Sequence, residues 1–319
     1  MLQIVNKALL KFMPIMTPAS VIIGILFAES LSPFLFLVPW LFAFMTFSGS
    51  LSSKFVDVKS VIKYPRPLIL CLIILHLIMP LIALGVGNIA FHNDPYTITG
   101  LVLAFLIPTG VSSLIWVTIN KGNVILTLSI ILIDSLLSPF IVPAVLQLLF
   151  GTTVHMNGSE IMQGLIWMIV LPSLLGMILN ETTKGKVDKF LTPKLAPFSK
   201  LCLGAVVALN GSAIAPYFKD INLKLIFITV TVFLLACTGY IMGWLVAKVF
   251  KENNSIKVAL VFNSGMRNIS AGAVIAITYF PPPVAVPVII GMLFQQILAS
   301  FTGSVLSRYT FRPANEISA

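Results

Sequence analysis

Charged residues are scarce in this sequence. Only 9% of its 319 residues are Asp, Glu, Lys or Arg, whereas about a quarter of a typical soluble domain is charged. This composition excludes a water-soluble domain. Between the charges lie runs that approach or exceed the roughly 20 apolar residues needed to cross a bilayer. Lipid offers the backbone no hydrogen-bonding partner, and the runs lack the alternation of barrel strands. The sequence therefore predicts an all-α polytopic membrane protein in contact with the lipid bilayer.

Residues that commonly build catalytic or metal sites are also few. The three cysteines, Cys71, Cys202 and Cys237, fall in different predicted helices and form no C-x-x-C pair, which argues against a disulfide framework or a cysteine metal site. The three histidines lie in separate regions, and neither H-E-x-x-H nor G-x-S-x-G occurs, so an intramembrane enzyme is the weaker alternative. We expect no catalytic residue, metal or cofactor.

Ten transmembrane helices are predicted from the apolar runs, and Pro281–Pro283 separates the last two. Their expected spans are 12–29, 33–52, 67–87, 98–119, 122–150, 161–180, 199–217, 223–249, 256–279 and 284–307. The longest loop between them, 181–198, contains two prolines.

The net charge of +10 comes from basic loops. No dense basic stretch with interleaved aromatics indicates nucleic-acid binding. Lysines and arginines collect in the N-terminus, in the loops after the even-numbered helices and in the C-terminus, while the opposite loops hold only Lys219 and Lys224. Because cytoplasmic loops are enriched in Lys and Arg, we expect a multi-pass protein of the cell membrane with both termini cytoplasmic.

The ten helices divide into two halves, 1–155 and 156–319, of five each. Five is odd, so the second half starts from the opposite side, as an inverted repeat requires. The fourth helix of each half carries a polar stretch, Pro108–Ser113 and Asn263–Ser270. A packed kink is one interpretation. Recurrence at equivalent positions instead predicts two broken helices at a ligand site.

Ionisable residues inside the predicted helices converge on one depth. At about 1.5 Å per residue, Arg267 lies roughly 15 Å, Asp134 about 18 Å and His76 about 14 Å from the cytoplasmic side. A charge at the bilayer centre is costly unless it is paired or lines a wet cavity. We therefore predict that Asp134 and Arg267 pair, directly or through water; the alternative is that the pair only holds two helices together. His76 is a candidate proton-binding group, or else a packing residue.

Four short motifs appear in order along these helices: Pro108-x-Gly110 followed by Ser113, Lys121–Val124, Ser138-Pro139 and Gly265–Asn268. In these motifs and over nearly its whole length, the chain resembles the bile acid:sodium symporter family. The resemblance implies two inverted five-helix repeats, a panel and a core domain assembled from both halves, and fourth and ninth helices that are broken and cross. It also implies transport of organic anions with sodium.

Several positions depart from the sodium ligands that the resemblance implies. The serine and one hydroxyl ligand are kept as Ser113 and Thr127. The other positions are changed: an amide to Leu114, a hydroxyl to Ile131, an acid to Asn263, and two glutamines to Arg267 and His76. Two ordinary sodium sites are therefore not expected. We predict a sodium-independent or proton-linked carrier, with His76, Thr127, Asp134 and Asn263 as coupling residues; a sodium-coupled symporter with atypical ligands is the alternative.

The substrate is expected where the second halves of the broken helices begin, since free amides and the helix dipole favour a carboxylate there. Ser112, Ser113, Arg267, Asn268 and Ser270 are the predicted substrate-binding residues. The expected partner is a small organic anion, which includes monocarboxylates, pantoate-like compounds and sterol acids. No obligatory protein partner is evident from the sequence.

Overall fold

The computed structural model describes residues 2–53, 65–154, 156–218 and 222–310, and every regular element in these ranges is a helix. Within these ranges, seven helices are long and apolar enough to cross a membrane: Ala28–Ser50, Pro65–Ala90, Val124–Phe150, Gly158–Thr182, Lys186–Phe218, Leu223–Val249 and Pro282–Arg308. Three shorter apolar helices are Ile15–Leu26, Pro95–Leu106 and Ile269–Tyr279. The predicted all-α class is confirmed. The predicted boundary at residue 155 and Lys219 lie outside the described residues.

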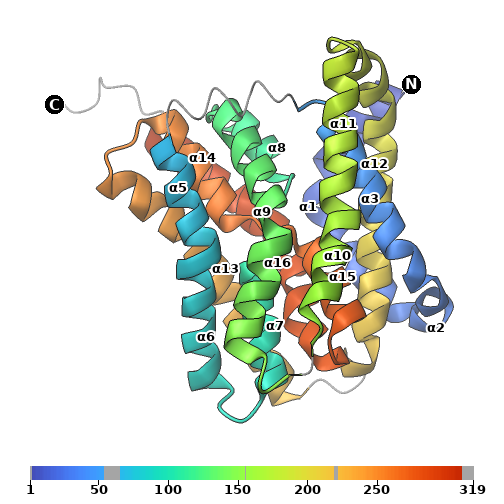
Figure 1. The fold of residues 1–319 in the computed structure, drawn as a ribbon, viewed down its shortest axis with the longest axis vertical. Helices are drawn as coiled ribbons and strands as arrows, with labels where there is room; N and C mark the ends of the chain where they lie inside the picture. The colour runs from blue at the N-terminus through green and yellow to red at the C-terminus, as the bar shows by residue number, and fades with distance from the viewer. Residues whose placement is uncertain (1, 54–64, 155, 219–221, 311–319) are drawn as a thin grey trace.

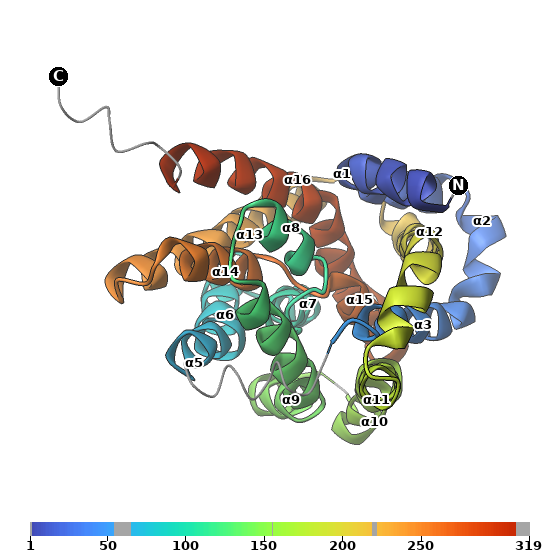
Figure 2. The ribbon, with the colours of Figure 1, turned by 90° about the horizontal axis from the view of Figure 1, so that it is seen from above.

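The helices form two groups that lie side by side (Figures 1 and 2). One group contains α1 (Leu2–Leu26), α2 (Ala28–Leu31), η1 (Ser32–Leu37), α3 (Val38–Ser50), α11 (Leu171–Thr182) and α12 (Lys186–Phe218). The other contains α5 (Pro65–Ile73), α6 (Met79–Ala90), α7 (Pro95–Leu106), α8 (Ser113–Ile119), α9 (Val124–Phe150), α13 (Leu223–Val249), α14 (Asn254–Gly265) and α15 (Ile269–Tyr279). Helix α10 (Gly158–Leu165) leads into α11, and α16 (Ala285–Thr310), which follows η4 (Pro282–Val284), contacts both groups.

Short polar side chains mark where many helices begin. In α7, α9, α10, α13 and α14 the N-cap residue accepts a hydrogen bond from a backbone N–H of the first turn. The caps are Asp94, Asn123, Asn157, Asn222 and Asn253. Such a cap satisfies a donor that has no intrahelical partner, so these residues set the helix starts locally.

The prediction of a loop over 181–198 is wrong. Helix α11 ends at Thr182 and α12 begins at Lys186, with a turn in which Lys184 and Gly185 have φ of 53° and 80°. Glycine reaches this left-handed conformation without steric cost, which allows so short a turn. The two prolines that suggested a loop lie inside α12. Membrane helices tolerate proline where neighbouring groups satisfy the freed backbone.

Two helices contain a wider π-helical turn. These turns, η2 (Ile74–Ile78) and η3 (Ile166–Val170), each end two residues before a proline, Pro80 and Pro172 respectively. Proline cannot donate to the preceding turn and its ring clashes there, so a local change of the hydrogen-bond pattern is expected. In η2 this change lies at His76.

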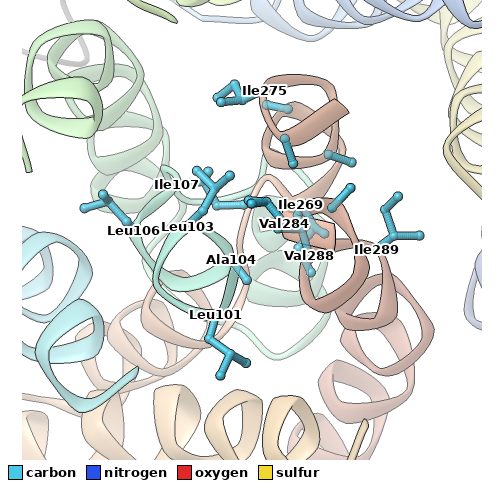
Figure 3. Close-up of a cluster of buried hydrophobic side chains, with 14 of the residues drawn as sticks. Leu101, Leu103, Ala104, Leu106, Ile107, Ile269, Ile275, Val284, Val288 and Ile289 are labelled. Atoms are coloured by element: carbon cyan, nitrogen blue, oxygen red, sulfur yellow. The ribbon is translucent and has the colours of Figure 1, made fainter. Parts of the chain in front are cut away.

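Apolar side chains surround the middle of the second group of helices. Figure 3 shows Leu101, Ala104 and Ile107 beside Ile269 and Val288, and all five are buried. They come from α7, from the residue that follows it, and from α15 and α16. This apolar layer fixes α7 and α15 at the ends where their helical hydrogen bonding stops.

Asp94 connects α7 to α13 at the end of the fold opposite the start of α1. Its carboxylate caps α7 and lies 2.7 Å from Lys224 Nζ of α13. Burial raises the pKa of Asp94, but hydrogen bonds from Lys224 and Thr97 outweigh it and hold the pKa below its ordinary value. A lowered pKa in the folded state means that the stabilisation is complete above the unfolded pKa and is lost as pH falls through the folded one.

We expect Asp94→Ala to lower the free energy of unfolding by about 1 kcal/mol, mainly through loss of the cap. Asp94→Asn keeps an acceptor for the cap but not the charge, so it should lose less and should flatten the acid dependence. Thermal unfolding in detergent between about pH 7 and about pH 3 measures both effects. Identical acid profiles of Asp94→Asn and the parent protein would contradict the assignment.

Candidate functional site

Two interruptions of the helical path lie at the predicted places. Helix α7 ends at Leu106 and α8 begins at Ser113, while α14 ends at Gly265 and α15 begins at Ile269. Each interruption leaves backbone N–H and C=O groups without helical partners. In an apolar layer every such group must find another partner, because an unsatisfied one costs several kcal/mol.

The two unwound segments satisfy each other. Thr109 and Arg267 form an antiparallel backbone bridge. The hydrogen bonds beside it run from Gly110 N–H to the Met266 carbonyl at 3.2 Å and from Asn268 N–H to the Pro108 carbonyl at 2.8 Å. The Thr109 hydroxyl donates to the carbonyls of Met266 and Asn263, and Arg267 N–H donates to Gln295 Oε1 at 3.0 Å. The segments therefore form a small backbone crossing joined like two strands.

Asp134 does not contact Arg267 among the described residues, so the prediction of a direct pair is wrong. Asp134 Oδ1 lies 2.5 Å from His76 Nε2, and its Oδ2 accepts the backbone N–H of Thr109 at 2.6 Å. Both carboxylate oxygens are thus occupied, and the residue is fully buried. Helical rise gives depth but not the direction in which a side chain points, and His76 of η2 points toward Asp134 of α9. Asp134 consequently connects η2 to the crossing itself.

Arg267 has a buried guanidinium group that forms no hydrogen bond with the described residues. The residue is 2% exposed, and none of its three side-chain nitrogens has a hydrogen-bond partner in the described part of the chain. The charge of Asp134 acts on it electrostatically, but no ion pair joins them among the described residues. Burying an unpaired charge is among the most costly arrangements in a protein. Arg267 therefore has unused capacity to hold an anion.

A cavity of about 300 Å³ lies between the two groups of helices, and Arg267 is one of the residues that line it. Of the predicted substrate-binding residues, Ser112, Arg267, Asn268 and Ser270 line it. The exception is Ser113, which is fully buried and bonds to Asn263 instead. The cavity extends past the end of α3 and the first half of α12, toward the end of the molecule where α1 begins (Figure 1).

Three of the predicted site residues form a neutral hydrogen-bonded network. Ser113 Oγ donates to Asn263 Oδ1 at 3.0 Å, and Asn263 Nδ2 donates to Thr127 Oγ1 at 3.1 Å and to the Ala259 carbonyl at 2.8 Å. Thr127 in turn donates to the Asn123 carbonyl. The Asn263 amide thus uses its carbonyl oxygen and its amino group within the protein. These positions correspond to sodium ligands in the resemblance, yet they carry no negative charge.

Two glutamines of α16 belong to the site and were not predicted from the sequence. Gln295 accepts the Arg267 backbone N–H, and Gln296 Oε1 accepts from Trp116 Nε1 at 3.0 Å; both line the cavity. Adjacent amides within the otherwise apolar span 284–307 were the available signal. Uncharged polar residues in membrane helices are costly and commonly face other helices rather than lipid.

Comparison with known proteins places these features in context. Residues 54–311 match the model of the SBF-like CPA transporter family. The chain is 54% identical to the uncharacterized protein YbaS of Bacillus subtilis over 301 residues, which cover 94% of this chain and 98% of YbaS. It is 24% identical to the uncharacterized sodium-dependent transporter YocS of the same organism, covering 86% and 84% of the two chains. A probable sodium/metabolite cotransporter, BASS1 of Arabidopsis thaliana, is also 24% identical, covering 79% of this chain and 62% of BASS1.

The two unwound segments approach each other so closely at Gly110 that an added methyl group should destabilise the fold. A Cβ at Gly110 would lie 2.7 Å from the carbonyl oxygen of Arg267, and the backbone pairing prevents either segment from moving aside. We expect Gly110→Ala to lower the free energy of unfolding by about 1–3 kcal/mol, the range for overpacking. Thermal unfolding of the purified protein measures this effect.

Gly85→Ala is the matched control. A Cβ at Gly85 of α6 would meet no atom within 4 Å, and alanine favours a helix interior over glycine. This variant should be as stable as the parent or more stable. Equal losses at Gly85 and Gly110 would show that the crossing is not sterically constrained.

Proposed function

The chain belongs to the SBF-like CPA transporter family, and we propose that it is a secondary carrier of small organic anions that works by alternating access. Membership of this family makes the protein a membrane transporter rather than an enzyme, in agreement with the resemblance to the bile acid:sodium symporter family. The nature of the substrate and of the coupling ion are our proposals, and each rests on the residues at the crossing.

Arg267 carries the proposal of an anionic substrate. Its guanidinium group is buried beside the cavity with all three nitrogens unpartnered among the described residues. A carboxylate can accept two parallel hydrogen bonds from this group and neutralise its charge. Ser112, Asn268 and Ser270 line the same cavity and supply further hydrogen bonds. A substrate carboxylate there would remove the largest electrostatic penalty of the unoccupied site.

The arrangement of the chain in the membrane is part of the same proposal. We propose ten crossings in two inverted five-helix repeats, residues 1–155 and 156–319, with the α7–α8 and α14–α15 segments as the equivalent broken helices. Both interruptions and their mutual pairing support this symmetry. The basic loops support a cell-membrane protein with cytoplasmic termini.

Two cavities support movement between two states. The cavity at Arg267 extends toward the end where α1 begins, and a second cavity of about 670 Å³ lies near Phe27, Pro216 and Pro282 at the opposite end (Figure 1). We assign the group with α1, α3, α11 and α12 to a panel domain and the group with the crossing to a core domain. Motion of one against the other would expose the crossing to each end in turn.

We further propose that protons, not sodium ions, couple to transport. The network of Ser113, Asn263 and Thr127 is neutral and internally hydrogen-bonded, whereas sodium needs several oxygen ligands. His76 and Asp134 can exchange a proton, and Asp134 accepts the Thr109 N–H at the crossing. Protonation of Asp134 would weaken that hydrogen bond and so shift the equilibrium between conformations of the crossing. Cys71 and Arg267 are the other titratable groups that share the electrostatic field of Asp134.

The variant Arg267→Gln tests whether Arg267 binds the substrate or only stabilises the fold. We expect Arg267→Gln to reduce uptake of the preferred anion by about ten- to hundredfold, the range for a lost charge-assisted hydrogen bond. Uptake into proteoliposomes should be screened with a short keto acid, pantoate and a sterol acid. The unliganded variant should melt at the same temperature as the parent or higher, because a buried unpaired charge has been removed.

Arg66→Gln is the control, because Arg66 is largely exposed and donates to the Phe250 carbonyl away from the cavity. It should leave uptake unchanged. Strong destabilisation by Arg267→Gln with intact uptake would assign Arg267 a structural role and contradict the proposal.

The coupling ion is tested by replacing sodium with choline during uptake at fixed pH. We expect no change, and we expect an imposed proton gradient to accelerate uptake. Asp134→Asn retains an acceptor for the Thr109 N–H but cannot titrate, so it should abolish the response to the proton gradient while the protein stays folded. Uptake that requires sodium would favour the alternative suggested by the name of YocS, a sodium-coupled symporter with atypical ligands.

A further inference from the structure

The cavity at Arg267 has an unusual charge balance. Among the residues that line it there is no Asp or Glu, but there are two basic residues, Arg267 and Lys200. Many of the remaining lining residues carry hydroxyl or amide groups, including Thr46, Ser135 and Gln295. A cavity with two positive charges and no acid in its lining favours a ligand with more than one negative charge.

Lys200 has a neutral partner and no acidic one among the described residues. Its Nζ donates to the side-chain oxygen of Asn6 in α1, a neutral acceptor. No carboxylate contacts Lys200 in the portion of the chain that the structure covers. The Asn6 oxygen accepts one hydrogen bond, whereas an ammonium group has three donors. The lysine is therefore positioned by α1 but is not neutralised.

The position of Lys200 on α12 directs it to the cavity. The lining residues of α12 are Thr192, Ala196, Ser199, Lys200, Leu203 and Val207. Their spacings of three and four residues define one face of a helix, and Lys200 is in the middle of this face. Arg267 belongs to the crossing, so the two charges approach the cavity from the two different groups of helices.

We infer that this carrier takes a small organic dianion, such as a short dicarboxylate, with one acidic group on Arg267 and the other on Lys200. This inference rests on the proposed function, and it narrows the substrate class. A cavity of about 300 Å³ lies at the small end of ligand sites, which favours a short metabolite over a sterol acid. A bound dianion would also connect α12 to the crossing, so that occupancy links the two groups of helices.

Binding to the purified full-length chain tests the inference. Isothermal titration should compare succinate, glutarate and adipate with the monocarboxylates of equal carbon number, namely butyrate, valerate and hexanoate. We expect at least one dicarboxylate to bind tenfold or more tightly than its monocarboxylate. In Lys200→Gln this affinity ratio should fall by about tenfold or more, as for a lost hydrogen bond to a charged group. Lys186→Gln, an exposed position at the start of α12, should keep the ratio.

The possible failures are distinct. If all three monocarboxylates bind as tightly as the dicarboxylates of equal carbon number and Arg267→Gln abolishes the binding of both classes, the two-point inference is wrong while the proposed function stands. If Lys200→Gln lowers the melting temperature but preserves the affinity ratio, Lys200 only stabilises the contact between α1 and α12, and the inference again fails. If neither class of acid binds, and Arg267→Gln changes nothing, the inference and the proposed function fail together.

Discussion

The backbones of residues 107–112 and 266–268 depend on each other. Neither segment is helical, and in an apolar layer neither can leave its amides and carbonyls unpaired. Pairing through Thr109 and Arg267 satisfies both at once, and the lack of a side chain at Gly110 permits the approach. This contact positions the ends of α7, α8, α14 and α15. A few backbone hydrogen bonds therefore determine where the polar side chains near the crossing lie.

The crossing also separates opposite charges that the sequence places at one depth. Asp134 binds the crossing through the Thr109 N–H and turns its other oxygen to His76, whereas Arg267 contributes backbone to the same crossing and its side chain to the cavity. A direct Asp134–Arg267 pair would satisfy both groups and leave neither for a ligand or a proton. In the structure Arg267 instead lines the cavity, while the His76–Asp134 pair is linked to the crossing through one backbone hydrogen bond. This separation is what the proposed anion site and the proposed proton coupling require.

The sequence was sufficient to predict properties that depend on composition and depth. Uncharged runs predicted the helical membrane class, and the polar stretches at 108–113 and 263–270 predicted where two helices are interrupted. The sequence was not sufficient to predict the directions in which side chains point. The partner of Asp134 is His76 in the π-helical turn η2, and Ser113, the first residue of α8, faces Asn263 rather than the cavity. The early start of α12, after one turn at Gly185, likewise places Thr192 and Ala196, which were predicted to lie in a loop, on the helical face that lines the cavity.

If the proposed coupling to protons holds, Arg267 and Asn263 together explain how the site would work without sodium. Where the resemblance implies an acid that attracts a mobile cation, Asn263 is a neutral amide whose hydrogen bonds end on Ser113, Thr127 and a backbone carbonyl. Where it implies a glutamine, Arg267 provides a cation that cannot dissociate. A dissociable ion neutralises the substrate only while it is bound, but a covalently attached one is always present and is costly when the cavity is empty. Retaining such a charge is difficult to explain by stability, and it is readily explained if an anion occupies the cavity during part of each cycle.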